Sequence, residues 1–342
     1  MQLALLVPAP FDAVSGGYEY DRRMLAGLRA GGHAVRVVEL AGAHPLADAT
    51  ARDAAARAWA DLAADETPII DGLGLPAFAD IDLTARATIG LIHHPTALET
   101  GFLPADRDSL RATERRLMPL LARIVVTSAP TAERLVANFG VRQDRISVVV
   151  PGTEDAPRCH GSAIGASCQV LSVGTLVPRK GHDVLLRALA RLVDMDWRLT
   201  IAGSADRDTV HAHGLAALAE ELGIASRVIF AGEVVDDALE ALWQQADIFA
   251  LTTHWEGYGM AIAEALKRGL PVVVTAGGAA GALVPAEAGA VCPPGEVDQI
   301  SKSLRRLIFS RELRLYLAEN AWQAGQALPS WDDQAHLFAE AI

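Results

Sequence analysis

The sequence TTHWEGYGMAIAEA occupies residues 252–265 and decides the fold. A mostly apolar run at residues 247–251 precedes it and is typical of a buried parallel strand. Residues 260–268 favour a helix, and Gly-Leu-Pro at 269–271 ends that helix before a valine-rich strand at 272–274. The order strand, glycine loop, helix, strand predicts a ligand at the carboxyl end of the first strand, beside the helix N-terminus.

Two glutamates frame this unit, Glu256 and Glu264, with seven residues between them. On one straight helix they would be separated by about 12 Å and turned roughly 80° apart. Gly257 and Gly259 remove that constraint and let the backbone come close to a ligand. We therefore predict Glu256 on a loop and Glu264 on the second helical turn, beside the free N–H groups that start the helix. Such a site suits a ligand that carries phosphate and several hydroxyls.

The composition narrows the class of protein. The chain has 342 residues and 51% apolar content, enough for two compact domains, and its net charge of −12 argues against nucleic acid as the main partner. We find no apolar run near the roughly 18 residues of a membrane-spanning helix, and residues 1–8 are typical of a first strand rather than a signal peptide. Cys159, Cys168 and Cys292 are odd in number and lack metal spacing. We expect reduced thiols in a cytoplasmic protein.

Strands and helices alternate through both halves of the chain. The pattern predicts an α/β protein of two Rossmann-like, doubly wound parallel sheets that face a central cleft. The predicted domains are 1–155 and 156–328, and residues 329–342 form a helix that packs back on the first domain. Polar and small residues at 155–167 predict the linker. Predicted strands lie at 3–8, 35–40, 68–71, 87–92, 123–128, 146–150, 169–173, 197–202, 228–231, 247–251, 272–274 and 289–291. Predicted helices lie at 18–30, 52–64, 106–121, 131–139, 183–192, 209–222, 237–245, 260–268, 296–309, 312–324 and 331–341.

Two features of the first half are candidates for binding. Gly16 and Gly17 follow the first strand, and they form either a tight turn or a set of N–H groups that faces a phosphate. His93 and His94 stand at the carboxyl end of another predicted strand. Adjacent residues of a strand face opposite sides, so we expect only one of them in the site. The alternative is an ordinary polar start of a loop.

Other charged and aromatic residues have simpler interpretations. The predicted helix 106–121 mixes four arginines with acidic residues, which favours a solvated face; contact with a membrane surface is the alternative. We expect Lys267 and Lys302 on helix surfaces, and His254 and Trp255 packed under the loop. The residues expected at the surface of the second half without ligand geometry are His182, His211 and His213.

The motif around Glu256 and Glu264 resembles the Glu-x7-Glu motif of family 4 glycosyltransferases. The resemblance extends over Gly16 and Gly17, residues 174–181, residues 269–272 and residues 288–295, in that order. It implies the GT-B fold, with residues 1–155 on the acceptor side and residues 156–328 binding the donor. It also implies a retaining, metal-independent enzyme without a cofactor. Such an enzyme moves a hexose-type sugar from a UDP- or GDP-linked donor to the hydroxyl of a small-molecule, glycan or lipid-linked acceptor.

The resemblance also implies a role for each matching position. Lys180 would pair with the donor diphosphate, Glu264 would bind the ribose hydroxyls, and Glu256 would contact the transferred sugar without acting as a nucleophile. His93 or His94 would lie near the sugar or the acceptor. The implied catalytic residues are Glu256, Lys180, His93 and His94. The implied donor-binding residues are Gly16, Gly17, Thr175, Arg179, Lys180, Gly203, Val234, Gly257, Tyr258, Gly259, Met260 and Glu264.

One position departs from the family pattern. Thr175 stands where the family often has an arginine paired with the lysine, and Arg179 is adjacent to Lys180 rather than at that position. The diphosphate would then be held by one cation and backbone N–H groups. Two alternatives remain open: a nucleotide-sugar epimerase or phosphorylase on the same fold, and a non-catalytic nucleotide-sugar-binding protein.

Overall fold

A computed structural model describes residues 1–163 and 165–342 of the chain. The chain divides into two compact units, Met1–Gly152 together with Pro329–Ile342, and Thr153–Leu328. Each unit contains one six-stranded sheet in which all neighbouring strands are parallel. The predicted linker 155–167 includes Ile164, which lies outside the described residues.

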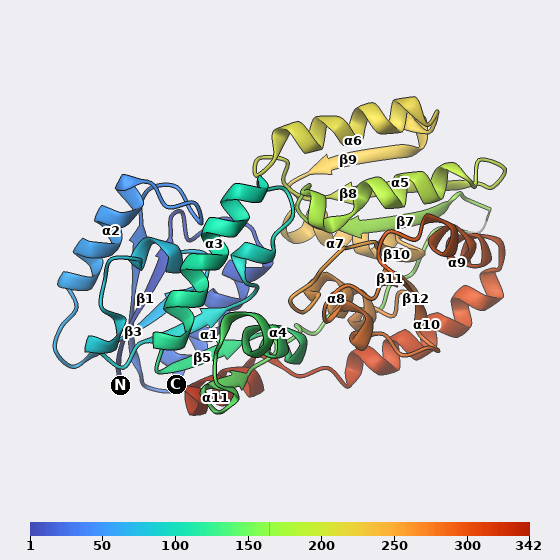
Figure 1. Ribbon diagram of the computed structural model, residues 1–342. Coiled ribbons are helices and arrows are strands. Elements are labelled where there is room, and N and C mark those ends of the chain that lie inside the picture. Colours follow the sequence, from blue (N-terminus) through green and yellow to red (C-terminus); the bar gives the residue numbers. More distant parts are fainter. Residues whose placement is uncertain (164) are drawn as a thin grey trace. The chain divides into compact units, whose positions relative to one another are not determined.

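The first unit has the strand order β2-β1-β3-β4-β5-β6 (Figure 1). Its strands are β1 (Gln2–Pro8), β2 (Ala34–Leu40), β3 (Glu66–Asp71), β4 (Ile89–Ile92), β5 (Arg123–Val126) and β6 (Ile146–Val148). Its helices are α1 (Gly16–Ala30), α2 (Ala49–Ala60), α3 (Pro104–Leu117), α4 (Ala129–Phe139) and α11 (Trp331–Ala341). Short 3-10 turns include η3 (Thr96–Leu98), which follows β4.

Alternation along the strands divides the first unit into two apolar layers. Leu3, Leu5 and Val7 of β1 belong to the layer that includes side chains of α1 and α11. Ala4 and Leu6 belong to the layer under α2, α3 and α4. Successive side chains of a strand point to opposite faces, so a strand buried on both faces reads as a continuous apolar run.

Helix α11 completes the first unit although it follows the whole second unit in sequence. Phe338 is 1% exposed and packs with Tyr20 of α1, with ring centroids 6.4 Å apart. A Cβ on Gly27 would lie 2.1 Å from the Cβ of Ala335, so α1 and α11 approach closely at a residue that has no side chain. The first unit is therefore built from two separate stretches of chain.

The second unit has the strand order β12-β11-β10-β7-β8-β9. Its strands are β7 (Cys168–Val173), β8 (Trp197–Ala202), β9 (Val228–Gly232), β10 (Ile248–Leu251), β11 (Val272–Thr275) and β12 (Gly289–Cys292). Its helices are α5 (His182–Ala190), α6 (Thr209–Glu221), α7 (Asp236–Gln245), α8 (Met260–Lys267), α9 (Val297–Phe309) and α10 (Arg311–Gln326).

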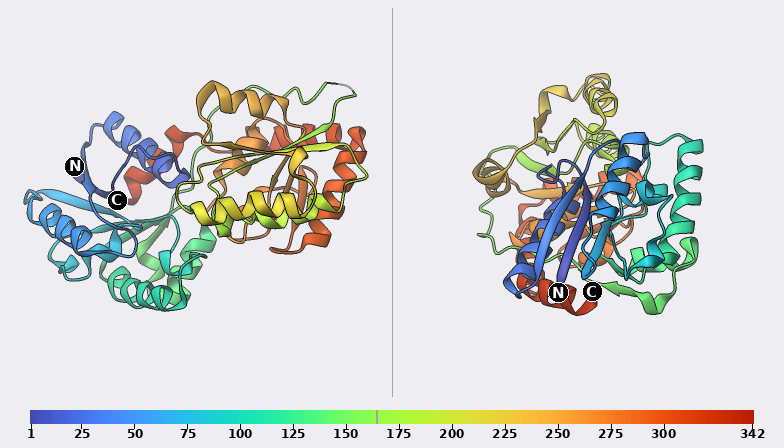
Figure 2. Two further views of the ribbon diagram at one scale, coloured as in Figure 1. Left: turned by 90° about the horizontal axis from the view of Figure 1, so that it is seen from above. Right: turned by 90° about the vertical axis from the view of Figure 1, so that its left-hand side faces the viewer.

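Helices cover both faces of this second sheet (Figure 2). One apolar layer contains side chains of α5, α6, α9 and α10, together with Ile248 and Ala250 of β10. The other contains Trp243 of α7 and side chains of α8, together with Phe249 and Leu251 of β10. The doubly wound α/β architecture expected from the alternation of elements is confirmed for each sheet.

Several predictions of exposure or burial are wrong. His182 is 1% exposed and Lys267 is 5% exposed, and Lys267 pairs with Asp155 at 2.9 Å instead of standing in solvent. Glu114 is fully buried, so α3 is not solvated along its whole acidic and basic length. His254 is exposed rather than packed under its loop. The burial of His182, Lys267 and Glu114 was missed for one reason, because a polar residue type predicts exposure on average and neighbouring elements decide the actual case.

Within the described residues, no helix is long and apolar enough to cross a membrane.

We predict that Phe338→Ala destabilises the first unit by about 3–5 kcal/mol, because it leaves a cavity between α1 and α11. Urea unfolding monitored by circular dichroism would measure this loss. The matched control is Phe309→Ala, since Phe309 is 83% exposed at the end of α9. The control should change stability by less than about 0.5 kcal/mol. Equal effects of the two substitutions would contradict the packing of α11.

Candidate functional site

Two clusters of charged side chains lie at strand ends, one in each unit. In the second unit, Lys180 ends the short turn η6 (Pro178–Lys180), which follows β7, and Glu256 lies on the loop after β10. Strands β7 and β10 are neighbours in the sheet, so their carboxyl ends meet at one edge. This topology brings together two residues that are 76 positions apart in the chain.

Lys180 and Glu256 form a largely buried ion pair. The Nζ atom of Lys180 lies 2.7 Å from Oε1 of Glu256, and the two side chains are 16% and 9% exposed. Arg179 Nη1 lies 3.5 Å from the same oxygen and donates to the carbonyl of Trp255 at 2.7 Å. Burial raises the pKa of Glu256, but the charges of Lys180 and Arg179 outweigh burial and lower it. Glu256 is therefore ionised between two cations at neutral pH.

Hydrogen bonds to backbone carbonyls fix the lysine turn to the glutamate loop. His254 N donates to the Arg179 carbonyl at 2.8 Å, and Thr252 Oγ1 donates to the Gly181 carbonyl at 2.6 Å. Gly181 has φ of +66°, and a Cβ there would lie 2.2 Å from the Thr252 carbonyl oxygen. Only glycine satisfies both conditions, so this residue allows the turn carrying Lys180 to lie directly against the end of β10.

The glycine loop and helix α8 lie where the sequence predicts them. Glu256 is on the loop, Gly259 precedes the first helical residue Met260, and Glu264 lies on the second turn and is half-buried. Tyr258 is buried, and burial raises the pKa of its hydroxyl to about 12. Met260 and Gly257 are half-buried beside it.

The remaining predicted donor-binding positions of the second unit are close to strand ends. Thr175 follows β7 and is half-buried, and Gly203 follows β8 and donates its N–H to the Gly232 carbonyl at 2.8 Å. Val234 is half-buried between β9 and α7. These residues therefore border the carboxyl edge of the second sheet.

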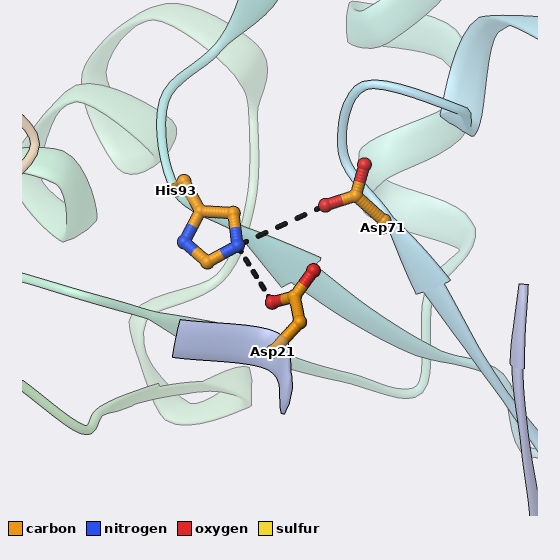
Figure 3. Close-up of side chains that lie close together, drawn as sticks. All are labelled: Asp21, Asp71 and His93. Atoms are coloured by element: carbon orange, nitrogen blue, oxygen red, sulfur yellow. Dashed lines mark hydrogen bonds and ion pairs between the residues drawn. The ribbon is translucent and has the colours of Figure 1, made fainter. Parts of the chain in front are cut away.

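The first unit contains a second cluster, made of His93, Asp21 and Asp71 (Figure 3). His93 follows β4 and Asp71 ends the neighbouring strand β3, while Asp21 is on α1. Nε2 of His93 lies 2.8 Å from Oδ1 of Asp21 and 3.8 Å from Oδ2 of Asp71. The two aspartates are buried, and the histidine side chain is 23% exposed.

Gly16 and Gly17 are the first two residues of α1, whose N-cap is Ser15. They were expected in a loop, and they belong instead to the first helical turn, where N–H groups lack helical partners. A Cβ on Gly17 would lie 3.4 Å from Cδ2 of His93. The start of α1 therefore lies directly against the histidine ring.

Burial and charge shift the titration of this second cluster. Burial, followed by the charge of Asp21, raises the pKa of Asp71 to about 7. Burial alone would lower the pKa of His93, but the charge and hydrogen bond of Asp21 and the charge of Asp71 outweigh it, and the pKa of His93 is raised. The raised pKa of His93 thus favours a protonated imidazole beside the two acids.

The loop that carries both histidines is anchored by α3. Glu114 accepts hydrogen bonds from the N–H and the hydroxyl of Thr96, each at 2.7 Å, and from the N–H of Ala97 at 3.1 Å. His93 contacts the two aspartates, and His94 is half-buried next to it. Of the two predicted histidines, His93 is the one that forms the cluster with Asp21 and Asp71.

Asp21, Asp71 and Glu114 were missed from the sequence. Asp71 ends a predicted strand that neighbours the strand before His93, so the strand-end rule used for the histidines could have found it. Asp21 and Glu114 lie inside helices, where no local pattern distinguishes them from surface acids. The donor atoms of His93, Asp21 and Asp71 lie within 4.8 Å of one another, a spacing at which a metal ion could also be held.

Comparison with solved structures identifies the fold. Sucrose-phosphate synthase from Thermosynechococcus elongatus aligns with a TM-score of 0.82 at 17% identity, over 99% of this chain and 98% of that chain. Anabaena Alr3699/HepE, in complex with UDP and glucose, aligns with a TM-score of 0.78 at 17% identity, over 99% and 98%. WaaG, a glycosyltransferase involved in lipopolysaccharide biosynthesis, gives 0.76 at 19% identity, over 99% of both chains. The fold is the GT-B fold of glycosyltransferases.

Comparison of sequences shows which family model and which curated proteins the chain resembles. Residues 165–324 match the model of the glycosyl transferases group 1 family. D-inositol 3-phosphate glycosyltransferase from Acidothermus cellulolyticus is 32% identical over 204 residues, 54% of this chain and 45% of the relative. The enzyme of that name from Salinispora tropica is 30% identical over 257 residues, 67% and 53%. The chain spans about half the length of the curated relatives it matches. The match over residues 165–324 and these relatives bear out the resemblance to GT-B glycosyltransferases of the family 4 type.

We predict that Asp71→Asn changes how stability depends on pH. The Asp71 carboxyl ordinarily loses its proton near 3.8 but holds it to about 7 in the folded unit. Folding therefore takes up a proton between these values, and this contribution to stability is lost as pH rises through them. The raised pKa of His93 acts with the same sign at higher pH. The wild-type Tm should accordingly fall relative to that of Asp71→Asn between pH 5 and pH 8.

Thermal unfolding monitored across this pH range would measure the difference. The matched control is Asp80→Asn, because Asp80 is exposed in the same unit. The control should follow the wild-type curve. Parallel curves for wild type and Asp71→Asn would contradict the raised pKa of Asp71.

Proposed function

We propose that this protein is a retaining, metal-independent glycosyltransferase. It would transfer a hexose-type sugar from a UDP- or GDP-linked donor to the hydroxyl of a small-molecule, glycan or lipid-linked acceptor. The observation that carries the proposal is the ion pair between Lys180 Nζ and Glu256 Oε1 at 2.7 Å, within a glycosyl transferases group 1 domain.

The charges of that pair suit a nucleotide diphosphate sugar. Lys180 offers an ammonium group to phosphate oxygens while it stays paired with Glu256, and Arg179 adds a second cation beside the same carboxylate. Glu256, ionised and held between these cations, is suited to accept hydrogen bonds from sugar hydroxyls. We assign Glu264 to the ribose hydroxyls, and the N–H groups of residues 257–260 to the phosphate and the sugar.

The proposed reaction breaks the bond between the anomeric carbon and the phosphate oxygen and forms a bond from that carbon to the acceptor oxygen on the same face. The acceptor proton passes to the departing phosphate oxygen. Lys180 and backbone N–H dipoles stabilise the charge that develops on the leaving diphosphate, which is commonly the largest catalytic term. In the first unit we assign His93 to the sugar or the acceptor.

UDP is the first donor base to test, because Anabaena Alr3699/HepE was solved with UDP and glucose. An acceptor panel should include D-inositol 3-phosphate, the compound in the names of the curated relatives. We further propose a cytoplasmic location, which the free cysteines Cys159, Cys168 and Cys292 support.

We expect Lys180→Ala and Glu264→Ala each to weaken nucleotide binding by roughly 1–3 kcal/mol, the usual cost of losing a hydrogen bond to a charged group. Titration calorimetry with UDP and with GDP would measure the affinities. The matched controls are Lys302→Ala and Glu287→Ala, because both residues are exposed in the same unit. The controls should bind as the wild type does. Unchanged affinity in the two site variants would refute the assignment of the donor site.

We expect turnover to persist in excess EDTA, because Lys180 and N–H dipoles would replace a metal ion at the diphosphate. Product mass spectrometry with a panel of nucleotide sugars and acceptors would follow the transfer. Loss of turnover under EDTA would contradict the metal-free mechanism. Donor conversion without acceptor would identify an epimerase, a need for inorganic phosphate would identify a phosphorylase, and binding without turnover would identify a non-catalytic protein.

A further inference from the structure

Among the residues that the structure describes, the polar partners of the His93 ring contact it through one nitrogen, Nε2. Nε2 lies 2.8 Å from Oδ1 of Asp21, which is a hydrogen-bond distance, and the Tyr20 ring packs against the imidazole in a T-shaped arrangement with centroids 5.3 Å apart. Gly17 closes a further side of the ring. These contacts fix both the plane of the ring and its rotation.

The second ring nitrogen, Nδ1, points away from both carboxylates (Figure 3). The histidine side chain is 23% exposed, whereas the side chains of Asp21 and Asp71 are 0% and 3% exposed. The exposed part of this cluster is therefore the imidazole, and the two acids lie behind it.

An ionised carboxylate can only accept a hydrogen bond, so Nε2 must carry the proton that it shares with Asp21. In the neutral ring, Nδ1 is then an acceptor; in the charged ring, Nδ1 is a donor. The same logic fixes the tautomer of a histidine in catalytic triads. The identity of the residue at position 21 thus decides what His93 presents to a substrate.

The cluster contains two carboxyl groups, although one is sufficient to accept the hydrogen bond from Nε2. Oδ2 of Asp21 is buried and has no hydrogen-bond partner among the described residues. Oδ1 of Asp71 accepts a hydrogen bond from the N–H of Leu73 at 2.9 Å. Oδ2 of Asp71 lies 3.8 Å from Nε2 of His93. The titratable groups that face the ring are Asp21 and Tyr20 from α1 and Asp71 from β3. Two buried acids beside one imidazole favour its charged form.

We propose that Asp21 and Asp71 are positioning residues for His93. Asp21 fixes the tautomer with the proton on Nε2, and Asp71 favours the charged ring, so that Nδ1 meets the substrate as a hydrogen-bond donor. The role of Nδ1 at a substrate rests on the proposed glycosyltransferase function, whereas the tautomer and charge of the ring do not.

A metal ion on the same three residues is the competing explanation. A zinc ion would require each donor atom at about 2.0–2.2 Å from a common centre and a deprotonated Nε2. The 2.8 Å contact between Nε2 and Oδ1 matches a shared proton directly. The proton therefore accounts for the geometry without an additional ligand.

Nitrogen NMR of histidine-labelled protein tests the tautomer without any assay of activity. The His93 signals are assigned as those missing from His93→Gln. With the ring titrated to its neutral form at high pH, we expect the proton on Nε2 in the wild type and a larger share of it on Nδ1 in Asp21→Asn, because the asparagine amide can donate to Nε2. The control Asp12→Asn, exposed in the same unit, should leave the signals unchanged. An unchanged tautomer in Asp21→Asn would overturn the proposal even if the protein proves to be a glycosyltransferase.

Kinetics in a double-mutant cycle tests the link to turnover. We expect Asp21→Asn to lower kcat by roughly 100-fold with a smaller change in donor KM, as for a misplaced catalytic group. The same substitution should not lower kcat further in the His93→Gln variant, because Asp21 acts through the imidazole ring. If the loss of kcat in the double variant were the product of the two single losses, the proposal would be overturned. So would saturable, stoichiometric binding of Zn²⁺ or Mn²⁺ to the EDTA-treated protein that Asp21→Asn abolishes.

Discussion

A buried carboxylate needs a compensating positive charge, and this requirement shapes both candidate sites. Glu256 is ionised in the second unit because Lys180 and Arg179 lie against it. Asp21 and Asp71 in the first unit share a single imidazole, His93, as their counter-charge. In each cluster the basic side chains are partly exposed and the acids are more deeply buried. The accessible groups of the two clusters are therefore basic, although the chain as a whole carries a net charge of −12.

The strand pattern made most of the fold predictable from sequence. Apolar runs such as residues 248–251 are buried on both faces, so their length and their glycine and proline borders locate them without knowledge of their neighbours. The ends of helices were less predictable: α1 begins at Gly16, two residues before the predicted start, because Ser15 caps it. Burial of His182, Lys267 and Glu114 was not predictable, since it depends on elements that are distant in sequence.

Some residues of the candidate sites were predictable from sequence, and others were not. Glu256, Lys180 and His93 were found because they belong to motifs or follow predicted strands, and the structure joins Lys180 directly to Glu256. No rule of spacing gives the 2.7 Å contact between them, which arises from the pairing of β7 with β10. Asp21 could not be found, because one acidic residue within a helix has no local signature. Its importance appears only when α1 is packed beside the end of β4.

The return of α11 to the first unit has a consequence for biosynthesis. Residues 1–152 emerge first from the ribosome, but the surface that Phe338 covers stays open until the entire Thr153–Leu328 segment has been translated. The nascent amino-terminal part must remain incompletely packed, with an apolar strip exposed, throughout that interval. The second unit is one contiguous segment, so its folding does not depend on a later part of the chain. The first unit thus cannot be complete before the second unit has been synthesised.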